Sequence, residues 1–87
     1  MNTMSPLRTF RTTRQIKLDA LADALGVHKT TAMRIETGAL AADADIVERI
    51  VLFTDGAVTA DDLHAVRLEW LRANRPEKFE PAPSEAA

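Results

Sequence analysis

The segment from residue 29 to residue 34 carries side chains whose chemistry suits the edges of DNA bases. Lys29, Thr30 and Arg34 occur at helical spacing, while Ala32 and Ile35 mark the opposite, apolar side of the same segment. A guanidinium donates two hydrogen bonds to guanine O6 and N7, an ammonium reaches the same atoms or a phosphate, and threonine offers a hydroxyl and a methyl group to thymine. These residue types therefore predict a surface that binds nucleic acid.

Further polar groups and basic side chains lie around this segment, and basic residues recur every three positions from Arg8 to Lys17. For that series two interpretations stay open, a solvated helix face or proximity to phosphate. We expect the phosphate contacts to come from Lys17, Thr31, Arg14 and His28. The alternative for Thr31 is a packing role, and the alternative for His28 is that it is a poor helix cap.

Hydrophobic periodicity predicts five helices and no strong strand, so the fold class is all-α. Ser5-Pro6 is typical of a helix start, and Thr59 to Asp62 resembles a capping box with Asp in place of the usual Glu. We expect Trp70, on the last helix, to belong to the core. The predicted helices cover about residues 6–13, 18–25, 29–37, 44–53 and 60–74.

Residues 18–37 have the layout of a helix-turn-helix. One helix ends at Gly26, a tight turn follows, and the next helix starts near His28. Leu25 and Ile35 are apolar where two steeply crossing helices would touch, and Ala22 is small where the second helix approaches. Gly26 stands where the turn requires a positive φ.

On these residues the chain resembles the phage Cro and phage-repressor family of helix-turn-helix proteins, small transcriptional regulators of the xenobiotic-response-element type. The resemblance covers about residues 7–63 and implies a five-helix, lambda-repressor-like DNA-binding domain with its helix-turn-helix at about 18–37. The matching positions are Leu7, Phe10-Arg11, Ile16, Leu21-Ala22, Leu25-Gly26-Val27, Ala32, Ile35-Glu36, Gly38, Asp55-Gly56-Ala57-Val58-Thr59 and Asp62-Leu63.

The resemblance also implies roles for single residues. Lys29 and Thr30 open the recognition helix at positions that contact base edges in the family, and Arg34 lies one turn further on the same face. Arg11 and Glu36 stand where relatives form a salt bridge that orients this helix. We place Met33 on the same outward face, where it contacts a thymine methyl group or is neutral surface.

Four positions depart from the family's pattern. Lys17-Leu18 replaces a capping Ser or Thr followed by a phosphate-contacting Gln, His28 replaces the Ser or Thr cap of the recognition helix, and Gln15 stands where Gly is common. We therefore expect the base-contacting positions to be kept and the phosphate contacts to be rearranged.

The net charge of −2 over 87 residues conceals two unlike halves. Residues 1–38 hold six basic and three acidic residues, a formal charge of +3, whereas residues 39–87 hold five basic and ten acidic residues, a charge of −5. The length fits one domain, which we place at 5–74, and the proline-rich residues 75–87 predict a disordered tail.

The composition excludes several function classes. The chain has no cysteine, and its two histidines have no serine or carboxylate arranged with them, so we expect no enzyme activity, no metal, no cofactor and no small-molecule ligand. No apolar run approaches the roughly 18 residues that a membrane helix needs. We expect a cytoplasmic, nucleoid-associated protein encoded by a bacterium or a phage.

The sequence favours a sequence-specific transcriptional regulator that binds double-stranded DNA, acting as a dimeric repressor on a short inverted repeat. Leu52 and Leu68 lie out of phase with the core positions of their helices and predict a homodimer interface, the alternative being scattered surface leucines. The alternative function is a protein-interaction module, an antitoxin or a phage adaptor, that uses the same fold.

Overall fold

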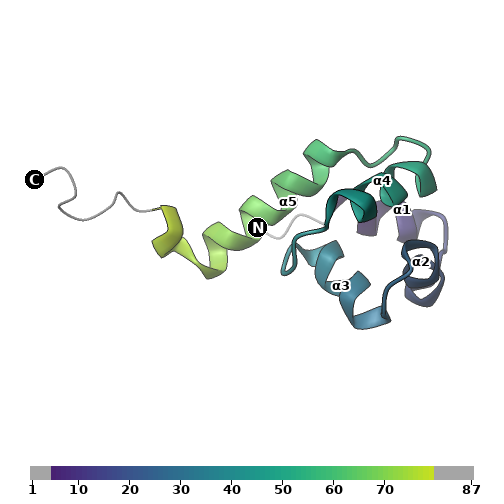
Figure 1. The fold of residues 1–87 in the computed structure, drawn as a ribbon, viewed down its shortest axis with the longest axis horizontal. Helices are drawn as coiled ribbons and strands as arrows, with labels where there is room; N and C mark the ends of the chain where they lie inside the picture. The colour runs from purple at the N-terminus through teal and green to yellow at the C-terminus, as the bar shows by residue number, and fades with distance from the viewer. Residues whose placement is uncertain (1–4, 80–87) are drawn as a thin grey trace, which may run out of the picture.

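The computed structural model describes residues 5–79, which form five α-helices and no β-strand (Figure 1). Both the all-α class and the five predicted helices are confirmed. The α-helices are α1 (Pro6–Thr13), α2 (Leu18–Leu25), α3 (Lys29–Thr37), α4 (Ala44–Phe53) and α5 (Ala60–Asn74), and a 3-10 turn, η1 (Pro76–Phe79), follows them.

The helix starts differ in how their free N–H groups are satisfied. Ser5 Oγ accepts a 3.2 Å hydrogen bond from the first turn of α1. At α5 the predicted capping box is confirmed, because Thr59 Oγ1 accepts from Asp62 N at 3.2 Å and Asp62 Oδ2 accepts from Thr59 N at 3.0 Å. By contrast, Lys17 and His28, which precede α2 and α3, make no capping hydrogen bond with their side chains.

The core lies between the first four helices and the loop that follows α4. Its one buried hydroxyl, on Thr54, donates to Ile50 O at 2.8 Å and accepts from Val58 N at 3.1 Å, so the turn after α4 is fixed to the end of that helix. The fully buried apolar side chains are Leu7, Leu21, Ala22, Leu25, Ala32, Ile35, Ile50 and Val58.

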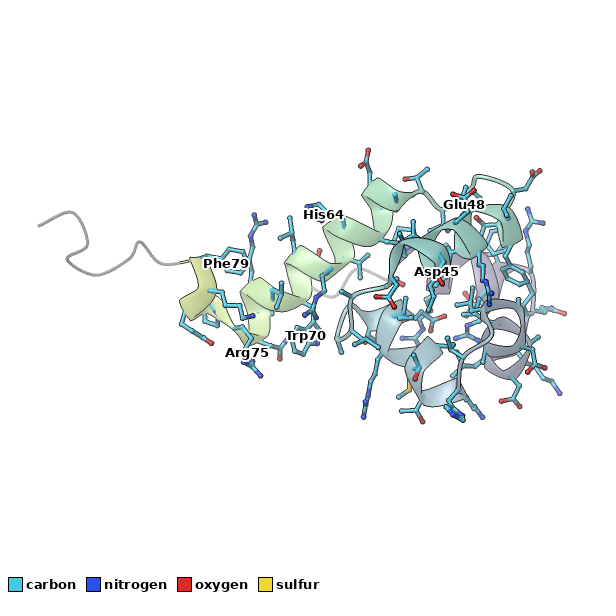
Figure 2. All side chains as sticks on the ribbon, in the orientation of Figure 1. Asp45, Glu48, His64, Trp70, Arg75 and Phe79 are labelled. Carbon is cyan, nitrogen blue, oxygen red and sulfur yellow. The ribbon has the colours of Figure 1, made fainter. Side chains whose placement is uncertain are left out.

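Helix α5 covers this core only in part. It has no fully buried residue, and its C-terminal half extends away from the body formed by α1 to α4 (Figure 1). Leu63 packs against the core, but Trp70 is half-buried and lies where α5 passes the end of α3 (Figure 2). The expectation of a core position for Trp70 was therefore wrong, because α5 leaves the body before Trp70 reaches the buried cluster.

The segment after α5 begins with a regular turn. The Arg72 guanidinium lies over the ring of Phe79, 5.5 Å from its centroid, and this contact accompanies η1. The prediction of a tail without regular structure from residue 75 is therefore wrong for 76–79, while residues 80–87 lie outside the described part of the chain.

Candidate nucleic-acid interface

Helices α2 and α3 are joined by a turn of three residues, 26–28. Gly26 has φ +70°, a left-handed conformation that glycine adopts without steric cost, and Val27 N donates to Ala22 O at 3.0 Å. These contacts end α2 and turn the chain directly into α3. As a result, both helices place their apolar side chains in the same core.

The buried side of α3 determines which residues face outward. Ala32 and Ile35 are buried, so the opposite side of the helix exposes the four predicted base-contacting residues. Met33 is 46% exposed, which is high for a large apolar side chain. The exposed positions on this outward face are Lys29, Thr30, Met33, Arg34 and also Thr37, which was not predicted.

Lys29 is not isolated on this face. Its Nζ lies 3.4 Å from Asp19 Oδ1, so an ion pair joins the first residue of α3 to the first turn of α2. Both side chains stay largely exposed, 63% for Lys29 and 69% for Asp19. Asp19 was not predicted as a site residue, because its contact with Lys29 depends on how α2 and α3 cross.

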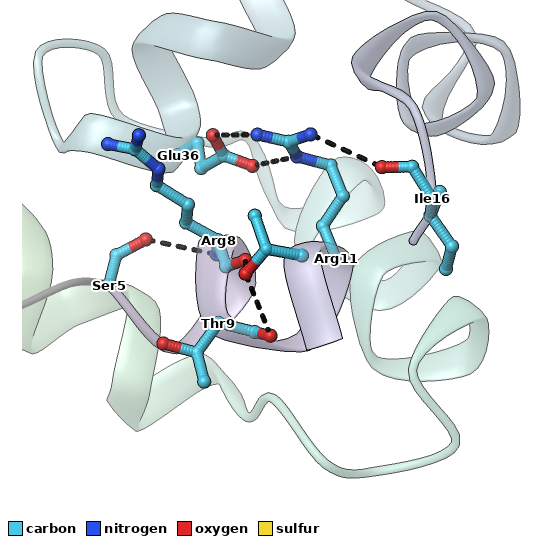
Figure 3. Close-up of polar contacts among 7 residues, drawn as sticks. Ser5, Arg8, Thr9, Arg11, Ile16 and Glu36 are labelled. Atoms are coloured by element: carbon cyan, nitrogen blue, oxygen red, sulfur yellow. Dashed lines mark hydrogen bonds and ion pairs between the residues drawn. The ribbon is translucent and has the colours of Figure 1, made fainter. Parts of the chain in front are cut away.

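The end of α3 is fixed to α1 by the predicted salt bridge, which is confirmed (Figure 3). Arg11 Nε donates to Glu36 Oε2 at 2.7 Å and Nη2 donates to Oε1 at 3.1 Å, while Nη1 donates to Ile16 O at 3.2 Å. The Glu36 side chain is only 4% exposed. Its hydrogen bond raises the pKa of the Arg11 guanidinium, with burial opposing and the carboxylate charge assisting, so Arg11 stays protonated.

Two further arginines hold the C-terminal ends of α2 and α3. Arg67 Nη1, from α5, donates to Gly38 O at 2.8 Å, and Arg49 Nη1, from α4, donates to Leu25 O at 2.9 Å. A cation at the carboxyl end of a helix satisfies a free carbonyl and complements the helix dipole. The position of α3 is thus fixed from α1 and from α5.

The predicted phosphate-contacting residues lie in different surroundings. Lys17 and His28 are exposed just before α2 and α3, where uncapped N–H groups of both helices are also free to bind an anion. Thr31 is half-buried. Arg14 is exposed but its guanidinium lies over the Phe10 ring, 4.4 Å from the centroid.

The two leucines predicted at a dimer interface differ in exposure. Leu52, on α4, is 69% exposed, and Leu68, on α5, is half-buried. The homodimer interface that they would form stays a prediction. The side chains of Asp45 and Glu48 project from α4 as acidic groups on the surface (Figure 2).

A groove of about 670 Å³ lies on another side of the molecule, between the start of α1, the end of α3, and α5. Trp70 and Val66 supply apolar surface there, and Arg8 and Glu69 supply charge. Within residues 5–79 no cluster of histidine or acidic side chains is placed to hold a metal ion, and none of the helices is long and apolar enough to cross a membrane.

Comparison with protein-family models, with curated proteins and with solved structures finds no match to this chain.

Proposed function

We propose that the protein is a sequence-specific DNA-binding transcriptional regulator in which α2 and α3 form a helix-turn-helix of the lambda-repressor type. In this proposal α3 enters the major groove and its outward residues contact base edges, with Lys29 and Arg34 donating to guanine and Thr30 and Met33 lying against thymine methyl groups.

The observation that carries the proposal is the contrast between the two sides of α3. Its inner side is buried, its C-terminal end is fixed by Arg11 and Arg67, and its outer side exposes two cations and a hydroxyl that make no contact with the core. A recognition helix needs this combination, because a rigid backbone has to present exposed donors that can reach a base.

The surrounding groups support phosphate binding on the same side of the molecule. Lys17 and His28 stand at the starts of α2 and α3, beside N–H groups that no side chain caps. The uncapped helix starts, which departed from the family's pattern in the sequence, suit phosphate oxygens as acceptors. Arg14 and Thr31 complete the proposed set of phosphate contacts.

We further propose that the protein acts as a homodimer on a short inverted repeat and represses transcription by covering promoter DNA. One α3 helix contacts few base pairs, and two-fold dimers on half-sites about one helical turn apart double that number. Leu52 and Leu68 are the proposed interface residues.

The direct test compares two substitutions that remove the same charge. Arg34→Ala lies on the proposed DNA-binding face, and Arg72→Ala lies on α5, on a different helix. In gel shifts on a selected DNA site, Arg34→Ala is expected to lower affinity about tenfold or more, because one good base contact provides about 1–3 kcal/mol of discrimination. Arg72→Ala is expected to leave affinity within about threefold, a change too small for a lost base contact. Equal effects of the two variants would refute the proposed DNA-binding face.

The alternative, a protein-interaction module, is favoured by one observation, the groove beside Trp70. Salt dependence separates the two functions. Binding of DNA through several phosphates weakens by about 10³-fold or more between about 50 and 200 mM salt. Binding of a protein through the apolar surface of Trp70 and Val66 in this groove responds much less to salt, and it would be lost on Trp70→Ala instead of Arg34→Ala.

A further inference from the structure

The ion pair between Asp19 and Lys29 places a carboxylate on the face that we propose to meet DNA. Asp19 Oδ1 lies 3.4 Å from Lys29 Nζ, and both side chains are more than 60% exposed. A second exposed acid, Asp23, lies one turn further along α2 but forms no ion pair among the described residues. Asp19 is thus the acid that directly contacts a proposed base-contacting side chain.

Stability does not explain this pair. An ion pair between exposed side chains contributes about 0–1 kcal/mol, because water and salt screen the charges and two long side chains lose freedom. A carboxylate on this face also repels DNA phosphates and lowers affinity for any DNA sequence. Its effect on binding is therefore expected to exceed its effect on folding.

The pair changes what Lys29 offers to DNA. A free lysine is a point charge on a flexible stem, and it binds a phosphate as readily as a base. An ammonium has three donors. The Asp19 carboxylate lies 3.4 Å away on one side of the ammonium, so the donors that point away from it are the ones available to DNA. Guanine, with O6 and N7 side by side, is the base whose major-groove edge presents two adjacent acceptors.

We propose that Asp19 is a specificity-determining positioning residue: it holds the Lys29 ammonium toward a guanine edge and keeps it from binding phosphate on unrelated DNA. This inference rests on the proposed function and deepens it by identifying the residue that directs Lys29 toward guanine. Asp19 touches no base itself. It acts through Lys29, so every effect of Asp19 on specificity disappears when Lys29 is absent.

The test measures equilibrium binding of the full chain to a selected DNA site and to all its single-base variants. The position at which Lys29→Ala abolishes base preference identifies the Lys29 contact, and the selected base there is expected to be guanine. Asp19→Asn is expected to lower discrimination at that position about tenfold and leave the other positions unchanged.

The same variant has a second expected effect, on non-specific binding. Releasing Lys29 to a phosphate makes the slope of log affinity against log salt steeper by about 0.9 for each added contact. Asp23→Asn removes the same charge from the same helix and is expected to leave discrimination as in the wild type. The double variant Asp19→Asn with Lys29→Ala is expected to discriminate no differently from Lys29→Ala alone.

The outcomes separate the inference from the function on which it rests. Wild-type discrimination in Asp19→Asn, or equal losses in Asp19→Asn and Asp23→Asn, would overturn the role of Asp19 while leaving DNA binding intact. A base other than guanine at the Lys29 position would also overturn it. A wild-type protein without preference for any DNA sequence would overturn the proposed function and this inference together.

Discussion

At the scale of single residues, Arg11 and Glu36 show how a buried pair fixes a functional helix. Glu36 lies in the last turn of α3 with both carboxylate oxygens accepting from the Arg11 guanidinium of α1. Removing one partner leaves a charge in a poorly hydrated place, whereas replacing both by apolar groups removes the charges together.

We therefore expect Glu36→Ala to lower the free energy of unfolding by about 3 kcal/mol, because the Arg11 guanidinium loses its partner. The double variant Arg11→Met with Glu36→Leu is expected to lose less than the single variant. Urea denaturation measures both. A single variant as stable as the wild type would mean that the pair does not hold α3.

A second residue-scale prediction concerns Gln15, which has φ +58° in the loop between α1 and α2. A left-handed conformation costs a non-glycine residue roughly 1–2 kcal/mol, and glycine removes this cost while gaining entropy in the unfolded chain. Gln15→Gly is expected to raise the free energy of unfolding by about 0.5–1 kcal/mol. Gln15→Val is the control with the opposite expected effect. Its branched side chain strains this conformation further and is expected to lower the melting temperature.

Contacts between residues were predictable from the sequence only where a sequence pattern specifies them. The Arg11–Glu36 pair followed from the family resemblance, and the family's preference for glycine at position 15 matches the positive φ of Gln15. Three features were not predicted: the Asp19–Lys29 pair, the stacking of Arg14 on Phe10, and the half-buried position of Trp70 beside the groove. The Asp19–Lys29 pair and the position of Trp70 depend on how helices cross, which hydrophobic spacing does not specify. Phe10 and Arg14 lie four positions apart at the end of α1, so their contact is local.

At the scale of elements, helix boundaries were predictable because the signals that start and stop a helix are local. Glycine after α2 and α3 and the capping box at α5 mark these boundaries in the sequence itself. The contacts of Arg49 and Arg67 with the ends of α2 and α3 were not predictable, because each joins residues more than 20 positions apart.

The close approach of α3 to α5 gives an element-scale prediction. A Cβ on Gly38, which has φ +92°, would lie 2.6 Å from Val66 O, whereas a Cβ on Gly56, at φ +82°, would meet nothing within 4 Å. Gly38→Ala is expected to cost more than about 2 kcal/mol, from strain and overlap, and Gly56→Ala about 1 kcal/mol, from strain alone. Similar losses of stability for the two variants in thermal unfolding would contradict the close approach of α3 to α5.

The uncapped start of α3 gives another prediction. His28 makes no capping hydrogen bond, and His28→Ser supplies a hydroxyl that accepts from the first turn. We expect the free energy of unfolding to rise by about 0.5–1 kcal/mol. Ser5→Ala, which deletes the existing cap of α1, is the reverse control and is expected to lose about as much. If His28→Ser did not raise the free energy of unfolding, the N–H groups at the start of α3 would already be satisfied by other acceptors.

At the scale of the whole molecule, the two oppositely charged halves suit a protein that binds DNA through few contacts. The half that holds α1 to α3 is basic, and the other half, with α4 and α5, is acidic. An acidic side weakens non-specific adhesion and orients the protein toward DNA. In the proposed function, affinity for DNA then depends on a small set of contacts, which the proposed dimer doubles.

The proposed dimer predicts that Leu52→Lys keeps the fold and removes self-association, because Leu52 is 69% exposed and a lysine there is solvated in the monomer. Sedimentation is expected to show a dimer for the wild type and a monomer for the variant. Leu40→Lys, at another exposed leucine, is the control and is expected to stay dimeric. A monomeric wild type at the concentrations that saturate DNA would contradict the dimer.

The central claim, that the outward face of α3 recognises DNA sequence, is tested most directly by selecting bound sites from random DNA with the wild type and with Lys29→Ala/Arg34→Ala. The proposal predicts that the wild type enriches an inverted repeat with half-sites about 10 base pairs apart and that the double variant enriches none. Arg72→Ala/Arg75→Ala, with the same charge loss, is expected to enrich the wild-type site. Enrichment of one and the same site by all three proteins, or of none by the wild type, would contradict the claim.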